Sequence, residues 1–275
     1  MPYNYLDPSL QPIADVIIKH LSAIGLKSIQ VEKVDFQASF APTLTANSRD
    51  GMKYCIEVNT TLFPKTLDSF IADCIQLGLP IKLYVAITEP ANNSYNSADL
   101  NRASKFGIGL FVVNGKKVQQ IRPALELSLL LDDSTKNLND FPKKLRPDLI
   151  TAINTYEGGD PKKGLSNVCE LAEEISRKVA KAAKAKGAIP SSNTLDLDND
   201  SWASVLKLML KHSVINDIIL SDWVSKTNIR NGTNHPAKNF NERSKIHRRF
   251  RTNFNACLNS LKDLIDECKK RGYRI

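Results

Sequence analysis

Residues 53–88 read KYCIEVNTTLFPKTLDSFIADCIQLGLPIKLYVAIT, and the spacing of their apolar residues changes twice. Lys53 to Thr60 alternates as a strand does. Pro64 to Leu77 has helical spacing, with a proline near its start and Gly78 after its end. Ile81 to Thr88 is a continuous apolar run, which is typical of a buried strand. A strand, a helix and a second strand in succession indicate a sheet covered by helices.

The same alternation continues on both sides of this stretch. Helical spacing is found at 12–24 and 97–106, and strand patterns at 29–36, 40–46, 108–113 and 117–121. The dipeptide Asp50-Gly51 is a hairpin signal between two of the strands. The order α-β-β-β-α-β-α-β-β predicts a mixed sheet with helices on its faces over residues 1–125.

Composition narrows the class of protein. A chain of 275 residues, 42% hydrophobic and 24% charged, has room for two folded domains. No stretch approaches the roughly 18 apolar residues of a membrane span, and the first residues lack the layout of a signal peptide. The five cysteines are scattered without zinc-like spacing, so we expect buried free thiols. These features predict a cytoplasmic protein with no membrane partner.

The excess of positive over negative charge is confined to one half of the chain. Residues 1–140 hold 13 Lys and Arg against 14 Asp and Glu, whereas residues 141–275 hold 25 against 15. The net charge of +9 therefore belongs to the C-terminal half. This asymmetry indicates a polyanionic partner for that half.

The predicted order of elements in residues 12–121 resembles the restriction-endonuclease-like fold of the PD-(D/E)xK nucleases. In that family two acids hold Mg²⁺ and a lysine helps to activate water. Here Glu57-Val58-Asn59 has Asn59 in place of the lysine, and Thr43 stands in place of the first acid. Asp50 could substitute for that acid but is better explained by its turn. We expect a nuclease-like scaffold that binds no metal, with Asp50 and Glu57 as degenerate candidates, serving recognition, docking or dimerisation.

The second half of the chain is predicted to be all helical. Residues 126–143 form a linker, after which helical spacing is found at 144–157, 161–186 and 202–223 and again near the C-terminus. Asp160 and Ser201 are expected N-caps. Four or five antiparallel helices over residues 144–275 predict a bundle, so the whole chain is an α+β protein of two domains.

An Arg-Asn-x-x-x-His segment, residues 230–235, precedes the last of these helices. It combines a guanidinium, an amide and an imidazole, which suits phosphodiester chemistry without a metal. Pro236 is a good first helical residue, so we expect His235 at a helix N-terminus, where anions are favoured. A polar turn before a helix is the plainer interpretation of the same residues.

This segment and its helical context resemble the HEPN superfamily of helical bundles, which includes prokaryotic toxins, abortive-infection proteins and CRISPR-associated ribonucleases. The turn Tyr156-Glu157-Gly158-Gly159-Asp160-Pro161, the long helix after it, and Arg230-Asn231-x-x-x-His235 carry the resemblance, which covers residues 144–271.

The resemblance implies RNA cleavage without a cofactor. His235 would take the proton of a ribose 2′-OH, Arg230 would stabilise phosphoryl charge, and Asn231 would orient the histidine or the phosphate. Family members usually dimerise, so the resemblance also implies a homodimer through the C-terminal helices. An antitoxin or another defence-system partner would fit such a protein.

Cations crowd the first half of the last helix. They are Arg243, Lys245, Arg248, Arg249 and Arg251. These side chains are candidates to hold the RNA backbone, and a merely solvated basic face is the alternative. His247, which lies among them, is expected on the solvated face.

Three functions are therefore open. The preferred one is a metal-independent endoribonuclease of a prokaryotic defence or toxin-like system. The first alternative is a non-catalytic module that binds nucleic acid or protein, and the second is a Mg²⁺-dependent DNA nuclease that uses Glu57 with Asp50.

Overall fold

A computed structural model describes residues 3–34, 36, 38–89, 95–231, 237 and 239–275 of the chain. The chain divides into two units. One comprises Met1–Leu130, Glu157–Gly159 and His235–Arg249, and the other comprises Leu131–Tyr156, Asp160–Asn234 and Phe250–Ile275. The predicted division into 1–125, 126–143 and 144–275 differs from this in three places. The predicted linker is split between the units after Leu130. A short turn and the first part of the last helix, both predicted in the helical half, group with the first unit.

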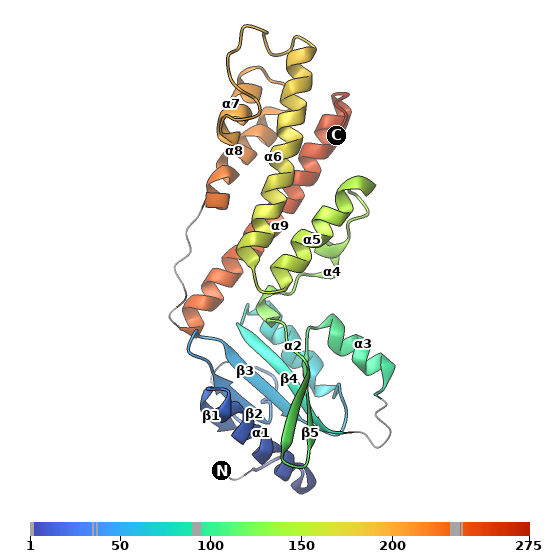
Figure 1. Cartoon of the computed structure of the whole chain (residues 1–275), viewed down its shortest axis with the longest axis vertical. Helices are drawn as coiled ribbons and strands as arrows, with labels where there is room; N and C mark the ends of the chain where they lie inside the picture. The colour runs from blue at the N-terminus through green and yellow to red at the C-terminus, as the bar shows by residue number, and fades with distance from the viewer. Residues whose placement is uncertain (1–2, 35, 37, 90–94, 232–236, 238) are drawn as a thin grey trace. The chain divides into compact units, whose positions relative to one another are not determined.

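Within the described residues, the first unit is built on one mixed sheet of six strands, which lie side by side in chain order (Figure 1). They are β1 (Lys27–Val31), β2 (Leu44–Asn47), β3 (Lys53–Val58), β4 (Ile81–Thr88), β5 (Gly109–Asn114) and β6 (Lys117–Arg122). β3 pairs with β4, and β4 with β5, in parallel, while the other neighbouring pairs are antiparallel. The predicted mixed sheet and the α+β class are thus confirmed, although β1 begins two residues earlier than predicted and ends at Val31.

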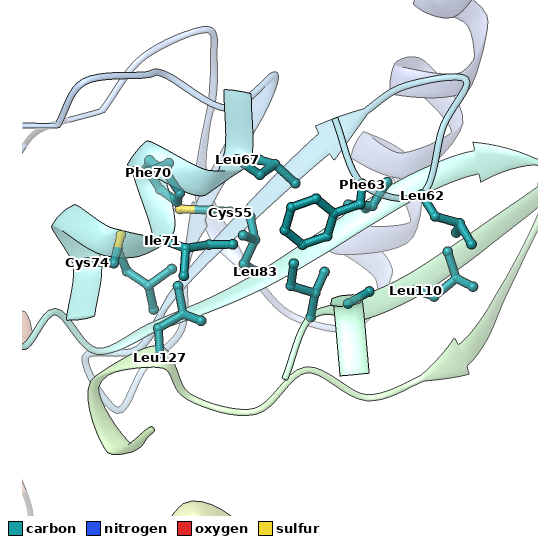
Figure 2. Packing of buried hydrophobic residues seen from close by; sticks show 14 of the residues in the cluster. Cys55, Leu62, Phe63, Leu67, Phe70, Ile71, Cys74, Leu83, Leu110 and Leu127 are labelled. Atoms are coloured by element: carbon teal, nitrogen blue, oxygen red, sulfur yellow. The ribbon is translucent and has the colours of Figure 1, made fainter. Parts of the chain in front are cut away.

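Both faces of the sheet are covered by helices. α1 (Gln11–Ala23) packs on one face with an apolar cluster that includes Tyr84 and Ala86 of β4. The other face, with Leu83 and Val85 of β4, belongs to the cluster of α2 (Thr66–Gln76) and α3 (Ser97–Lys105). Figure 2 shows the α2 side chains pointing toward the strands in this second cluster. Burial on both faces explains why β4 is a continuous apolar run.

Helices make up most of the second unit. They are α5 (Arg146–Glu157), α6 (Pro161–Ala185), α7 (Trp202–Lys211), α8 (Asp217–Asn231) and the part of α9 (Phe240–Lys270) that follows Arg249. Asp160 and Ser201 cap α6 and α7 through their side chains, as predicted. The single helix expected at 202–223 was wrong. Ser213 has a φ of +44°, and Val214 N donates to the Met209 carbonyl at 3.0 Å, which ends α7.

The predicted linker at 126–143 is folded. It contains two 3₁₀ turns, η2 (Leu127–Leu129) and η3 (Lys143–Leu145), and the short helix α4 (Asp133–Lys136), while a further turn, η1 (Pro8–Leu10), precedes α1. The side chains of η2 are buried, and its Leu127 adds to the apolar cluster beneath α2.

Two expectations drawn from composition can be compared with the structure. All five cysteines are buried free thiols, as predicted. Among the described residues, no helix is both long enough and apolar enough to cross a membrane.

The absence of a side chain at Gly109 leaves space for the stacked rings of Tyr84 and Phe111. Gly109 faces Tyr84 across the β4–β5 pair, and the Tyr84 ring stacks on Phe111 with centroids 4.3 Å apart. A Cβ on Gly109 would lie 2.3 Å from two carbons of that ring. We expect Gly109→Ala to destabilise the first unit by about 1–3 kcal/mol through overpacking, measured by urea unfolding. The same change should cost less in a Tyr84→Leu background, and equal costs in the two backgrounds would contradict this explanation.

Candidate functional site

The Arg-Asn-x-x-x-His segment begins at the end of α8. Arg230 and Asn231 are the last two residues of that helix, and His235 lies outside the described residues. α9 begins at Phe240, where the side-chain oxygen of Asn239 accepts a hydrogen bond from Glu242 N at 2.9 Å. The helix start expected at Pro236 lies outside the described residues, and Asn239 supplies the cap of the helix that the structure describes. The catalytic roles of Arg230, Asn231 and His235 stay predictions.

The basic residues of α9 fall into two groups. Lys245, Arg248 and Arg249 are exposed, and their spacing of three and four residues places them on one side of the helix. Arg243 and Arg251 are half-buried. Because Arg243 binds two carboxylates, the basic surface available to a polyanion is smaller than the sequence suggested.

Glu126 is the centre of a buried polar cluster in the first unit. Its side chain is 4% exposed. Arg243 Nη2 lies 3.1 Å from Oε2 and His247 Nδ1 lies 2.7 Å from Oε1. Ser128 Oγ donates to Oε1 at 3.0 Å and lies 2.8 Å from His247 Nδ1. Since Arg243 and His247 are one turn apart on α9, a single carboxylate binds both.

The partners of Glu126 stabilise its charge. Burial raises the pKa of this carboxyl, but the hydrogen bonds and charges of His247 and Arg243 outweigh burial and hold the pKa below its ordinary value. His247 was expected on a solvated face. That prediction was wrong, because the residue is only 6% exposed.

Asp50 binds the remaining edge of Arg243. Arg243 Nη1 lies 3.0 Å from Asp50 Oδ2. Asp50 also accepts hydrogen bonds from the Ser48 hydroxyl and, at 3.4 Å, from Met52 N. Burial raises the pKa of Asp50, but the bond from Ser48 and the charge of Arg243 bring it below its ordinary value. The turn role predicted for Asp50 fits these contacts.

The positions compared with the nuclease motif come together around Glu57 on β3. Glu57 is 8% exposed, and its Oε2 accepts hydrogen bonds from Thr43 N and Thr43 Oγ1, both at 3.0 Å. Asn59 adds a side-chain hydrogen bond. Burial raises the pKa of Glu57, and these neutral donors offset the rise only in part. The groups that donate hydrogen bonds to Glu57 are thus neutral, and the nearby Glu32 carboxylate raises its pKa further.

A cavity of about 390 Å³ lies beside Glu57 and is also lined by Glu32, Tyr5 and Leu6. The Glu32 carboxylate accepts hydrogen bonds from the backbone N–H groups of Asn4, Tyr5 and Leu6 at 2.6, 2.8 and 2.7 Å. Glu32 therefore fixes the N-terminal segment. Among the residues that the structure describes, no group of three His, Cys, Asp or Glu side chains could hold a metal ion.

The structure does not bring Asp50 and Glu57 together. Asp50 lies in the turn before β3, and Glu57 follows seven residues later near the end of that strand. The part of this stretch that is extended, from Lys53 to Glu57, alone spans about 13 Å. The two acids also line different cavities. A single Mg²⁺ ion could not be shared between them.

Comparisons with known proteins add little. No family model matches the chain, and no curated protein matches it significantly. A solved structure of a protein of unknown function from Silicibacter pomeroyi is similar to part of the chain. The match has 17% sequence identity and a TM-score of 0.31, and it covers 45% of this chain and 75% of that one. A TM-score this low supports no transfer of fold or activity.

The raised pKa of Glu57 predicts how its replacement changes stability with pH. The pKa of Glu57 is higher in the folded protein than in the unfolded chain, so its ionisation destabilises the fold. The contribution of Glu57 to stability therefore falls as pH rises from the unfolded pKa to the folded pKa. Glu57→Gln should raise Tm at pH 7–8 and change it little near pH 4. Each kcal/mol gained would appear as about 2–4 °C.

Asp73 on α2 is a matched control for this measurement. Its pKa is lowered by hydrogen bonds from Ser39, so its carboxylate stabilises the folded state above the unfolded pKa and loses this effect as pH falls. Asp73→Asn should therefore lower Tm at neutral pH. Equal Tm values for wild type and Glu57→Gln across pH 4–8 would contradict the assignment for Glu57.

Proposed function

We propose that the protein is a metal-independent endoribonuclease of the HEPN type, acting in a prokaryotic defence or toxin-like system in the cytoplasm. The observation that carries the proposal is the Arg-Asn-x-x-x-His segment in a basic, helical half of the chain. It is supported by the exposed cations Lys245, Arg248 and Arg249, which follow the segment on α9. An antitoxin or another defence-system protein would be its natural partner.

In the proposed reaction, His235 takes the proton of a ribose 2′-OH, and that oxygen attacks the adjacent phosphorus. The bond from phosphorus to the 5′ oxygen of the next nucleotide breaks, and this oxygen is protonated as it leaves. Arg230 stabilises charge on the phosphoryl oxygens, and Asn231 orients the histidine or the phosphate. The products are a 2′,3′-cyclic phosphate and a 5′-hydroxyl end. DNA, which lacks the 2′-OH, is not a substrate.

Binding of the RNA backbone is assigned to the exposed cations of α9. Lys245, Arg248 and Arg249 can reach phosphates through contacts that weaken as salt rises. Arg243 is left out of this set, because Glu126 and Asp50 already bind its guanidinium. Arg251 is half-buried and contributes less than the sequence suggested.

The first unit serves as a binding or dimerisation scaffold in this proposal. The described donors to Glu57 are the neutral side chains Thr43 and Asn59, which stand where a metal-dependent nuclease of that family has its first acid and its lysine. The same observation favours a second candidate function, in which the whole protein is a non-catalytic module that binds nucleic acid or protein. A Mg²⁺-dependent DNA nuclease that uses Glu57 with Asp50 is the least favoured function, since the two acids line different cavities.

Replacement of His235 tests the catalytic proposal. His235→Ala should lower the rate of RNA cleavage by about 10²–10⁴, the usual contribution of general acid–base catalysis. Arg230→Ala should have a similar effect, and Arg230→Lys should recover only part of the rate, because lysine keeps the charge without the bidentate fork. Cleavage is followed on labelled RNA with and without EDTA, and the ends of the products are identified.

Lys211→Ala is a control outside the segment, since this exposed lysine at the end of α7 should leave the rate unchanged. If wild-type protein cuts no RNA, or if His235→Ala cuts as fast as wild type, the binding-module function takes the place of catalysis. Cleavage of DNA that needs Mg²⁺ would instead favour the metal-dependent nuclease.

The proposed enzyme should be a two-fold dimer through its C-terminal helices. A second copy of the Arg-Asn-x-x-x-His segment across an isologous interface would exclude water from the reacting phosphate. Light scattering at micromolar concentration should therefore give about twice the chain mass of 30.6 kDa. A mass of one chain under these conditions would count against the dimer.

A further inference from the structure

The first ten residues of α9, 240–249, are attached to the rest of the first unit mainly by polar groups. Of the described side chains in this segment, Ser244 and His247 are the buried ones. Ser244 Oγ donates to the Gly78 carbonyl at 2.8 Å. Phe240, which is half-buried, stacks on Phe36 with centroids 6.1 Å apart. Phe240 also packs against the apolar cluster of α2, so the apolar attachment described for this segment lies at its first residue, and the buried side chains that follow are polar.

Glu126 makes the charged part of this attachment. Its carboxylate binds Arg243 and His247, the two side chains of the segment that face the same point one turn apart. Asp50 from the β2–β3 turn adds a second carboxylate to Arg243. Tyr54 of β3 and Lys82 of β4 line the cavity that Glu126 and Arg243 share. Glu126 is the buried member of this group, whereas the side chain of Asp50 is 62% exposed.

The buried carboxylate of Glu126 fixes the positions of both side chains that it binds. If its charge is removed, Arg243 and His247 lose the carboxylate that both of them bind. Asp50 cannot replace it, because an exposed ion pair contributes little. The attachment of residues 240–249 thus depends on Glu126 more than on any other side chain described in the cluster.

We propose that Glu126 is a positioning residue, which holds residues 240–249 in place and thereby sets where the chain that carries His235 is anchored. This role rests on the proposed function, in which His235 transfers the proton. Phe240 follows His235 by five residues, and five residues span at most about 18 Å. Fixing Phe240 therefore limits the volume from which the imidazole can reach a phosphate. Glu126 itself touches neither RNA nor the reacting atoms.

The test uses the full-length chain with Glu126→Gln, which removes the charge at nearly constant size. Amide hydrogen exchange in residues 240–249 should speed up roughly 10- to 100-fold relative to wild type, as expected for the loss of one charged hydrogen bond. In RNA cleavage, kcat should fall on the order of 10²-fold, the effect of a small misplacement of a catalytic group. KM should stay nearly constant, because Lys245, Arg248 and Arg249 are retained.

Three further variants make the result specific. Glu126→Asp, which keeps the charge on a shorter side chain, should recover part of kcat. Asp73→Asn removes another hydrogen-bonded carboxylate of the first unit, one that binds Ser39, and should change neither exchange in 240–249 nor kcat. His247→Gln is the milder variant if Glu126→Gln does not fold, and it should give the same pattern with smaller changes.

Each outcome decides a separate claim. Unchanged exchange in residues 240–249 of Glu126→Gln would overturn the attachment. Faster exchange with unchanged kcat would overturn the positioning role. If the wild-type protein cuts no RNA, the proposed function fails and the positioning role falls with it, while the exchange measurement still decides whether Glu126 holds the segment.

Discussion

The parallel pairing of β3 with β4 is the constraint on which the first unit depends. The register runs without a break from Lys53 opposite Ile81 to Val58 opposite Ala86. Parallel strands need a crossover, and α2 supplies it. Because both faces of this pair are buried, a slip by one residue would exchange the side chains beneath α1 with those beneath α2. The register therefore also fixes Glu57, which by alternation shares the α2 face with Cys55 and is forced into a buried position.

Glu57 and Glu126 show that the hydrogen-bond and charge partners of a buried carboxyl, rather than its degree of burial, decide whether its pKa is raised or lowered. The two are similarly buried, at 8% and 4% exposure, yet their pKa values move in opposite directions. Glu57 has only the neutral donors Thr43 and Asn59, which cannot offset the cost of burial. Glu126 has Arg243 and His247. Glu57, the position compared with the nuclease motif, thus resists ionisation. The negative charge of Glu126, which belongs to no motif, is stabilised.

Much of the fold could be predicted from the sequence, because local patterns determine it. The apolar runs at β4 and β5 and the caps at Asp160 and Ser201 are short-range signals, and they predicted the right elements. The break after Lys211 was missed because apolar spacing continues through it, and only the backbone at Ser213 shows the turn. Residues 126–143 were assigned to a linker because their polar end outweighed the apolar leucines before it.

The candidate site was harder to predict, because its contacts join residues far apart in the chain. Glu126 and His247 are 121 residues apart, and no spacing rule connects them. The sequence held one signal, since Glu126 is a lone charge in the apolar run ALELSLLL, and a buried charge must find a partner. His247 gave no such signal, because the exposed cations around it suggested a solvated face. By contrast, Thr43, Glu57 and Asn59 could be brought together in advance, since the resemblance supplied their relation.

Residues 240–249 are held by charged and polar contacts at their buried side chains, and this makes their position sensitive to the loss of one group. An apolar seam would keep a helix in place whatever the charge of its neighbours, because burial of hydrocarbon does not depend on protonation. Here the buried side chains of the segment are a serine and a histidine, and its strongest partner is one carboxylate. Such an attachment is specific in geometry but fails when a single group is removed. In the proposed function, the position of residues 240–249 is therefore controlled by Glu126, a residue that the nuclease-like motif does not include.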